Sequence, residues 1–148
     1  MLVEDVMNRS IRTVSKDDKV LEVASIMCLY RIPGLPVVED DKLIGYIAEK
    51  DILSFLFPSL EEVMDGSSGQ AYDNMQQNYS DATEKKVHEI MTSSVLSVST
   101  GTHVLKAAAT MATNKFRRIP VVDDGVLMGV LSLGDVHKAL FKNQIATY

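Results

Sequence analysis

The chain has 148 residues and a formal net charge of −5, which argues against a nucleic-acid-binding surface because such surfaces normally need a basic face. Hydrophobic residues make up 46% of the sequence, yet no apolar run approaches the roughly 20 residues that a membrane-spanning helix needs. We therefore expect a globular fold outside the membrane. The first residues lack the basic and then apolar pattern of a signal peptide, which favours a cytoplasmic protein.

One segment of the sequence occurs twice. Residues 3–53 align without a gap on residues 87–137, at a constant offset of 84. A segment that recurs in this way indicates one supersecondary unit used twice, and two such units are expected to close as a pseudo-twofold pair. The predicted organisation is repeat 1 over residues 1–57, an insert over residues 58–86 and repeat 2 over residues 87–148. Any site should come in two copies, so differences between the copies become evidence.

The same order of elements is predicted in each repeat. A short β-branched strand, over residues 11–14 or 95–98, precedes an amphipathic helix whose apolar residues recur at helical spacing from Val20 or Val104. A hairpin follows, with strands over residues 35–38 and 43–48 in repeat 1 and over residues 119–122 and 126–132 in repeat 2. A second helix closes each repeat. Helices on one side of a small mixed sheet give an α+β fold.

Three smaller features complete this interpretation. The single cysteine, Cys28, cannot form an internal disulfide and is expected to be buried among the apolar positions of the first helix. In the insert, Pro58 and Ser59 with Glu62 predict a short helix, and a turn is expected over residues 66–69. A second helix is predicted from an apolar stripe, Tyr72, Met75, Tyr79 and Ala82. We favour a linker that covers its own domain over a partner-binding element.

Two sequence motifs occur once in each repeat. The apolar-Pro-Val-Val-acidic segment is found at residues 35–39 and 119–123. The pattern Gly-x-x-[Ser/Thr]-x-x-Asp is complete over residues 129–135, whereas residues 45–51 keep the glycine and the aspartate but have Ala48 at the hydroxyl position. On these residues the chain resembles a tandem pair of cystathionine β-synthase (CBS) domains, with only the insert and residues 141–148 outside the resemblance.

That resemblance implies two β-α-β-β-α repeats packed as a pseudo-twofold pair. It also implies two clefts that bind adenine nucleotides or adenosyl compounds, and often a homodimer of such pairs. Proteins of this kind sense a ligand and do not catalyse by themselves. In similar pairs, arginines ahead of the inner strand can reach a nucleotide in either cleft, and Thr13 and Ser97 stand where the family offers further hydroxyl contacts.

The residues support a nucleotide site on physical grounds as well. An aspartate at the start of the closing helix, Asp51 or Asp135, holds two acceptor oxygens that suit the 2′ and 3′ hydroxyls of a ribose. Ser132 can donate to a ribose or phosphate oxygen near that helix N-terminus. Arg117 and Arg118 can offer bidentate contacts to phosphate, with Arg118 the favoured one of the two.

Repeat 1 lacks several of these groups, because Ala48, Pro33 and Gly34 occupy the positions of Ser132, Arg117 and Arg118. The sequence therefore predicts asymmetric binding, with repeat 2 holding the stronger site. Plainer roles compete with each assignment. The aspartates can act only as helix caps, Ser132 can be a solvent-facing strand residue, and the arginines can be ordinary surface charges.

No metal site is predicted. The methionines suit core positions, and three histidines lack the spacing of zinc ligands, so that solvated or capping roles are expected for His88, His103 and His137. The sequence also lacks a nucleophile paired with a base and a glycine-rich loop for phosphate, which argues against an enzyme.

Two functions remain open from the sequence. The favoured hypothesis is a regulatory module that binds AMP, ADP, ATP or S-adenosylmethionine as a ligand and shifts the packing of the repeats or of two protomers. The alternative is an assembly module with vestigial clefts that binds a partner protein. A homodimer is expected through the outer helices because of an apolar run that includes Leu53, Phe55, Leu56 and Phe57. The sequence does not identify an effector protein.

Overall fold

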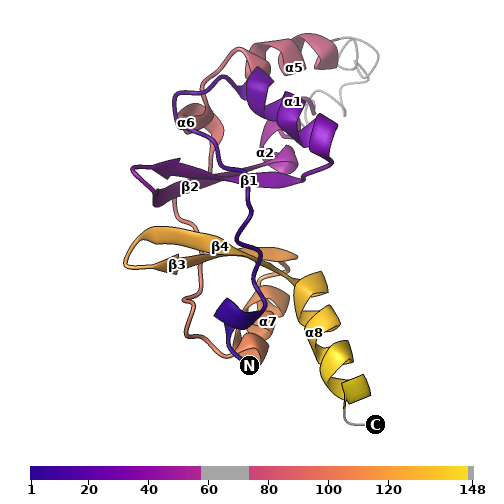
Figure 1. Cartoon of the computed structure of the whole chain (residues 1–148). Coiled ribbons are helices and arrows are strands. Elements are labelled where there is room, and N and C mark those ends of the chain that lie inside the picture. Colours follow the sequence, from indigo (N-terminus) through magenta and orange to yellow (C-terminus); the bar gives the residue numbers. More distant parts are fainter. Residues whose placement is uncertain (58–73, 147–148) are drawn as a thin grey trace. The chain divides into compact units, whose positions relative to one another are not determined.

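The structure is a computed structural model that describes residues 1–57 and 74–146, and it divides into two compact units (Figure 1). Unit 1 comprises Met1–Arg12, Asp40–Leu43 and the described part of Val95–Tyr148. Unit 2 comprises Thr13–Glu39 and the described part of Ile44–Ser94. The units cut across the two repeats, because the first residues of each repeat lie in the unit that holds most of the other.

Unit 2 is built around the hairpin of β1 (Gly34–Glu39) and β2 (Lys42–Ala48), although the first residues of β2 fall in unit 1. Its helices are α1 (Val20–Tyr30), α2 (Glu49–Leu53), α5 (Met75–Thr83) and α6 (Val87–Ile90). The apolar stripe of α1 is buried from Val20 to Met27 as its spacing predicts, and it packs with residues of the hairpin, α2 and α6 in one core. The buried members of this core are Val14, Val20, Val23, Ala24, Met27, Leu35, Val37, Ile47, Ile52 and Val87.

Unit 1 repeats this arrangement with a short 3₁₀ helix, η1 (Val3–Asp5), in place of α6. Its other elements are α7 (Val104–Thr113), β3 (Arg118–Asp123), β4 (Val126–Ser132) and α8 (Leu133–Ala146). The antiparallel pair of β3 and β4 runs from Arg118 opposite Ser132 to Asp123 opposite Val126. Its core is formed by Val3, Met7, Val104, Ala107, Met111, Ile119, Val121, Leu131 and Val136.

The predicted opening strands are wrong in extent. Within residues 11–14 and 95–98, only Val14 and Val98 form bridges, which are parallel to Val37 and Val121. Each makes two backbone hydrogen bonds, for example from the Val14 amide to the Pro36 carbonyl and from the Val38 amide to the Val14 carbonyl, both at 3.0 Å. The next bond of such a ladder would need an amide hydrogen on Pro36, or on Pro120 in unit 1, and proline has none.

The burial predicted for Cys28 is also wrong, because this residue is exposed. The helix buries Ala24 and Met27, and Cys28 lies beyond the edge of that buried stripe. In the insert, α5 contacts α1 and α2 of its own unit, Tyr79 packs against the core and Ala82 is fully buried. This part of the insert therefore covers its own domain, as favoured above.

The other predictions for the insert, at Pro58, Ser59, Glu62, Tyr72 and residues 66–69, lie outside the described residues. The α+β class is confirmed by the helices and strands of both units. The pseudo-twofold packing of the repeats stays a prediction. Within residues 1–57 and 74–146, no helix is both long and apolar enough to cross a membrane.

Candidate functional site

The start of α8 joins two of the predicted site residues. The Ser132 amide donates to Oδ2 of Asp135 at 3.1 Å, and the Asp135 amide donates to Oγ of Ser132 at 3.0 Å. This reciprocal pair is a capping box, in which Ser132 precedes the helix and Asp135 is its third residue. The prediction that Asp135 itself occupies the cap position is therefore wrong, because the serine hydroxyl takes that role.

The start of α2 has half of this arrangement. The Ala48 amide donates to Oδ2 of Asp51 at 2.8 Å, so that Asp51 is also a third helical residue and not the cap. Ala48 carries no side-chain oxygen to accept a bond from the Asp51 amide. Asp51 and Asp135 thus hold the same local position, but only Asp135 has a hydroxyl beside it.

Unit 1 places the two arginines beside the start of α8. Arg118 lies directly opposite Ser132 across the pair of β3 and β4. The Leu133 amide, the first of α8, donates to the Arg117 carbonyl at 2.9 Å. Both arginines are exposed, so their guanidinium groups are open to solvent and to a ligand.

Ser97 belongs to unit 1 as well, on the other side of β3. It precedes Val98, whose bridge to Val121 lies on the side of β3 away from β4. The Ser97 side chain is exposed. Unit 1 therefore gathers five of the seven predicted site residues around β3 and the start of α8, namely Ser97, Arg117, Arg118, Ser132 and Asp135.

Unit 2 holds the remaining two, Thr13 and Asp51. Thr13 is exposed and precedes Val14, which bridges to β1, while Asp51 is half-buried at the start of α2. The counterpart of Arg118 is Gly34, and there the ring of Tyr46 fills the space above the backbone. A Cβ atom on Gly34 would lie 2.6 Å from Cε1 of Tyr46, so a side chain at this position would require the Tyr46 ring to move.

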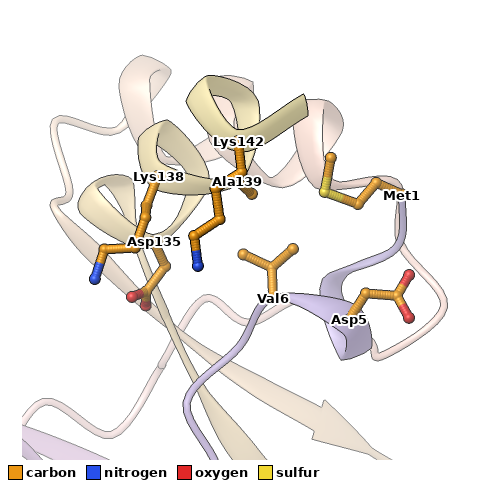
Figure 2. A pocket seen from close by; sticks show the side chains of 7 residues that line it. All are labelled: Met1, Asp5, Val6, Asp135, Lys138, Ala139 and Lys142. Carbon is orange, nitrogen blue, oxygen red and sulfur yellow. The ribbon is translucent and has the colours of Figure 1, made fainter. Parts of the chain in front are cut away.

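An open hollow of about 300 Å³ lies within unit 1, between α8 and the N-terminal segment (Figure 2). Asp135 lines it, together with two lysines that the sequence reasoning missed, Lys138 and Lys142. Their spacing of three and seven residues from Asp135 is the signal that could have found them, because such residues share one helix face. The other lining residues are Met1, Asp5, Val6 and Ala139.

The histidines do not gather into a site. His103 caps α7, because its Nδ1 accepts a hydrogen bond from the Leu105 amide at 3.1 Å, which confirms the capping role expected for this residue. His88 and His137 are exposed. In the part of the chain that the structure describes, no three His, Cys, Asp or Glu side chains come together as metal ligands.

Known proteins that resemble this chain are found both by sequence and by structure. Protein MJ1426 of Methanocaldococcus jannaschii is 30% identical, with coverage of 95% of this chain and 91% of its own. The CBS domain-containing protein YhcV of Bacillus subtilis is 28% identical, with coverage of 97% and 89%.

Among solved structures, the CBS-pair protein CBSX2 of Arabidopsis thaliana superposes with a TM-score of 0.78 at 29% identity, covering 97% of this chain and 96% of that chain. A structure of CBSX2 in complex with AMP superposes with a TM-score of 0.75 at 29% identity, covering 97% and 98%. The family model of the CBS domain matches residues 3–58 and 87–142. Both repeats are therefore CBS domains, and the chain belongs to the CBS domain family.

Proposed function

We propose that this chain is a cytoplasmic regulatory module that senses an adenine nucleotide or an adenosyl compound in the cleft between its CBS domains. The observation that carries the proposal is the start of α8, where Ser132, Asp135 and Arg118 lie together and Asp135 borders a hollow. The AMP complex of CBSX2, at 29% identity over nearly the whole chain, supports this ligand class.

Each of these residues has a role that its geometry allows. Only Oδ2 of Asp135 is engaged with the described residues, which leaves Oδ1 as an acceptor for a ribose hydroxyl. The Ser132 hydroxyl accepts from the Asp135 amide and keeps its own hydrogen for a ligand oxygen. Arg118, across the strand pair from Ser132, and its neighbour Arg117 can pair with a phosphate. Ser97 and Thr13 are proposed to add hydroxyl contacts.

Binding is proposed to be stronger at repeat 2 than at repeat 1. Ala48 offers no hydroxyl beside Asp51, and Tyr46 covers the position that would carry an arginine. Asp51 remains a candidate for a weaker contact, because its Oδ1 makes no bond with the described residues. The module is proposed to act without catalysis, through the packing of its domains or protomers.

Thermal unfolding with a ligand panel tests this proposal. A ligand at 100 times its dissociation constant stabilises the folded state by about 2.7 kcal/mol, which is visible as a shift of the unfolding midpoint. We expect AMP, ADP, ATP or S-adenosylmethionine to give such a shift with the unmodified chain. Asp135→Ala should abolish the shift, and Asp51→Ala should reduce it less.

Because Asp135→Ala also removes a helix-capping acceptor, a matched control is needed. Glu89 plays the same capping role at α6, where it accepts a hydrogen bond from the Lys86 amide at 2.7 Å, and it is not a proposed ligand residue. Glu89→Ala should lower stability without ligand but retain the ligand-induced shift. If Glu89→Ala and Asp135→Ala lose the shift equally, the proposed role of Asp135 is wrong.

An assembly module is the second candidate, and exposed apolar side chains favour it. The exposed fractions are 75% for Leu29 and 52% for Tyr30 on α1, 64% for Phe57 after α2, and 58% for Phe141 on α8. Such residues suit a contact with a second copy of the chain or with a partner protein. A homodimer is compatible with both candidates. Absence of any shift across the whole ligand panel would favour assembly as the main function.

A further inference from the structure

One face of α8 forms a wall of the hollow in unit 1. Asp135, Lys138, Ala139 and Lys142 all line it and follow one another at the spacing of residues that share a helix face. Ala139 has only a methyl group, which leaves space between the longer side chains. Val6, beside η1, lines the hollow from the other segment (Figure 2). The hollow therefore combines an apolar lining with two ammonium groups along one helix.

These two ammonium groups have no acidic partner among the described residues. The ion pairs found there are Lys16 with Glu39 and Lys19 with Glu84, and neither involves α8. Lysines four residues apart on a helix repel each other by a few tenths of a kcal/mol. An anion bound between them would offset this repulsion. The pair places two positive charges on the α8 side of the hollow, beside the proposed ribose acceptor.

Two carboxylates also line the hollow, and each keeps its negative charge while it accepts one amide hydrogen bond. Asp135 accepts from the Ser132 amide, and Asp5 accepts from the Leu2 amide at 2.9 Å. Figure 2 shows the Asp5 carboxylate at the end of the hollow away from Lys138. On the α8 side, two lysines therefore stand beside one carboxylate, so positive charge is in excess there.

We propose that Lys138 and Lys142 bind the phosphate chain of a nucleoside di- or triphosphate and so select it over a monophosphate; this inference rests on the proposed function. Along the axis of α8, Lys138 lies about 4.5 Å and Lys142 about 10.5 Å beyond Asp135, at 1.5 Å per residue. A phosphate close to the ribose can meet the nearer lysine, whereas a longer chain can meet both. Lysine suits this role as a flexible point charge on phosphate.

Calorimetric titration with adenosine, AMP, ADP and ATP tests the inference, using the unmodified chain and the double variant Lys138→Gln/Lys142→Gln. We expect the unmodified chain to bind ADP and ATP more tightly than AMP, and AMP more tightly than adenosine. The double variant should lose about tenfold in affinity for ATP, a modest value because the lysines are exposed to solvent. Its affinity for adenosine should stay unchanged, which also shows that the variant folds.

A matched control keeps the change in net charge constant. Lys42 and Lys106 are exposed residues of unit 1 that do not line the hollow. The double variant Lys42→Gln/Lys106→Gln should bind every ligand like the unmodified chain. Equal losses in both double variants would mean that overall charge, and not the hollow, governs binding, and would overturn the inference.

The outcomes also separate this inference from the proposed function. If the unmodified chain binds none of the four compounds and no S-adenosylmethionine, the proposed function itself fails. If it binds them but the Lys138→Gln/Lys142→Gln variant keeps the same ranking and affinities, only the role of the lysines is wrong. A loss for ATP without a loss for adenosine supports both.

Discussion

The two CBS domains of this chain make equivalent backbone hydrogen bonds, but their side chains differ at the places where a ligand is proposed to bind. The Val14 amide donates to the Pro36 carbonyl at 3.0 Å, and the equivalent bond from Val98 to Pro120 is 3.1 Å long. The first amide of α2 donates to the Pro33 carbonyl and that of α8 to the Arg117 carbonyl, both at 2.9 Å. These bonds fix the same strand ends in both domains.

The side chains on this common backbone have diverged. Ser132 faces Arg118 across the strand pair in one domain, whereas Ala48 and Gly34 occupy these positions in the other. The comparison teaches that equivalent backbone hydrogen bonds form in both domains, while the side chains proposed to bind a ligand differ at the strand ends. Three sets of substitutions test this separation.

The largest effect is expected from placing an arginine at position 34 of the first domain. A side chain on Gly34 collides with the Tyr46 ring, so Gly34→Arg should lower the free energy of unfolding by about 1–3 kcal/mol. The counterpart of Tyr46 is Val130, which coexists with Arg118. We therefore expect Tyr46→Val, added to Gly34→Arg, to recover part of that loss in urea denaturation.

The single variant Tyr46→Val completes a double-mutant cycle for this pair. A favourable coupling of about 1 kcal/mol between the two substitutions is expected, because the smaller residue makes room for the larger one. Strict additivity would contradict the idea that Tyr46 is what keeps an arginine out of the first domain.

Smaller effects on stability, of opposite sign in the two domains, are expected from substitutions at the starts of α2 and α8. Ala48 has the extended backbone of a cap residue, with φ −120° and ψ 160°, so Ala48→Ser should complete the capping box of α2. We expect it to raise the free energy of unfolding by about 0.5–1 kcal/mol. Ser132→Ala should lower it by about 1 kcal/mol.

Chemical denaturation of both variants measures these effects. Ser54→Ala serves as a control, because this exposed residue after α2 uses its hydroxyl to donate to the Asp51 carbonyl and takes no part in the capping box. If Ala48→Ser leaves stability unchanged, the two helix starts differ in more than the missing hydroxyl.

The helix starts also show what could be predicted from the sequence. The spacing of Ser132 and Asp135 is that of a capping box, so the sequence holds a signal for their pairing, but the aspartate itself was predicted at the cap. Hairpins and helix stripes were predicted closely because their periodicity is local. The short opening segments were not, since the proline that limits each of them lies on a distant strand.

The distribution of the first residues between the units could not be predicted. Val3 and Val87 occupy the same repeat position and are both fully buried, so either residue suits either core by type and size. A duplicated sequence therefore gives no signal for which copy of the segment joins which unit. The hollow was missed for a related reason, because it depends on the N-terminal segment lying beside α8.

The smallest effects on stability are expected from a pair of polar residues that occupies equivalent positions in the two domains but has a different composition in each. In the second domain, the Thr100 hydroxyl and amide donate to Asp123 at 2.6 and 3.1 Å, which lowers the pKa of that carboxyl below its ordinary value of 3.8. In the first domain, Lys16 pairs with Glu39 at 3.0 Å, and the hydrogen bond and charge of Glu39 raise the pKa of Lys16 above 10.5.

These opposite shifts predict losses at opposite ends of the pH range. A lowered carboxyl pKa stabilises the folded state above the unfolded pKa near 3.8, and this stabilisation is lost as the pH falls through the folded value. A raised lysine pKa stabilises below 10.5, and the gain is lost as the pH rises through the folded value. Both groups are exposed enough for solvent to screen them, so the changes should be small.

Unfolding free energies measured across pH for Thr100→Val and Lys16→Met separate the effects of the two pKa shifts. Thr100→Val should lower the free energy of unfolding by a constant amount above about pH 5 and by less in acid. Protonation of Asp123 removes much of the stabilisation that the Thr100 hydroxyl gives to the charged carboxylate. The deficit of Lys16→Met should instead shrink in alkali. Deficits that do not change with pH would mean that packing, and not charge, distinguishes the variants.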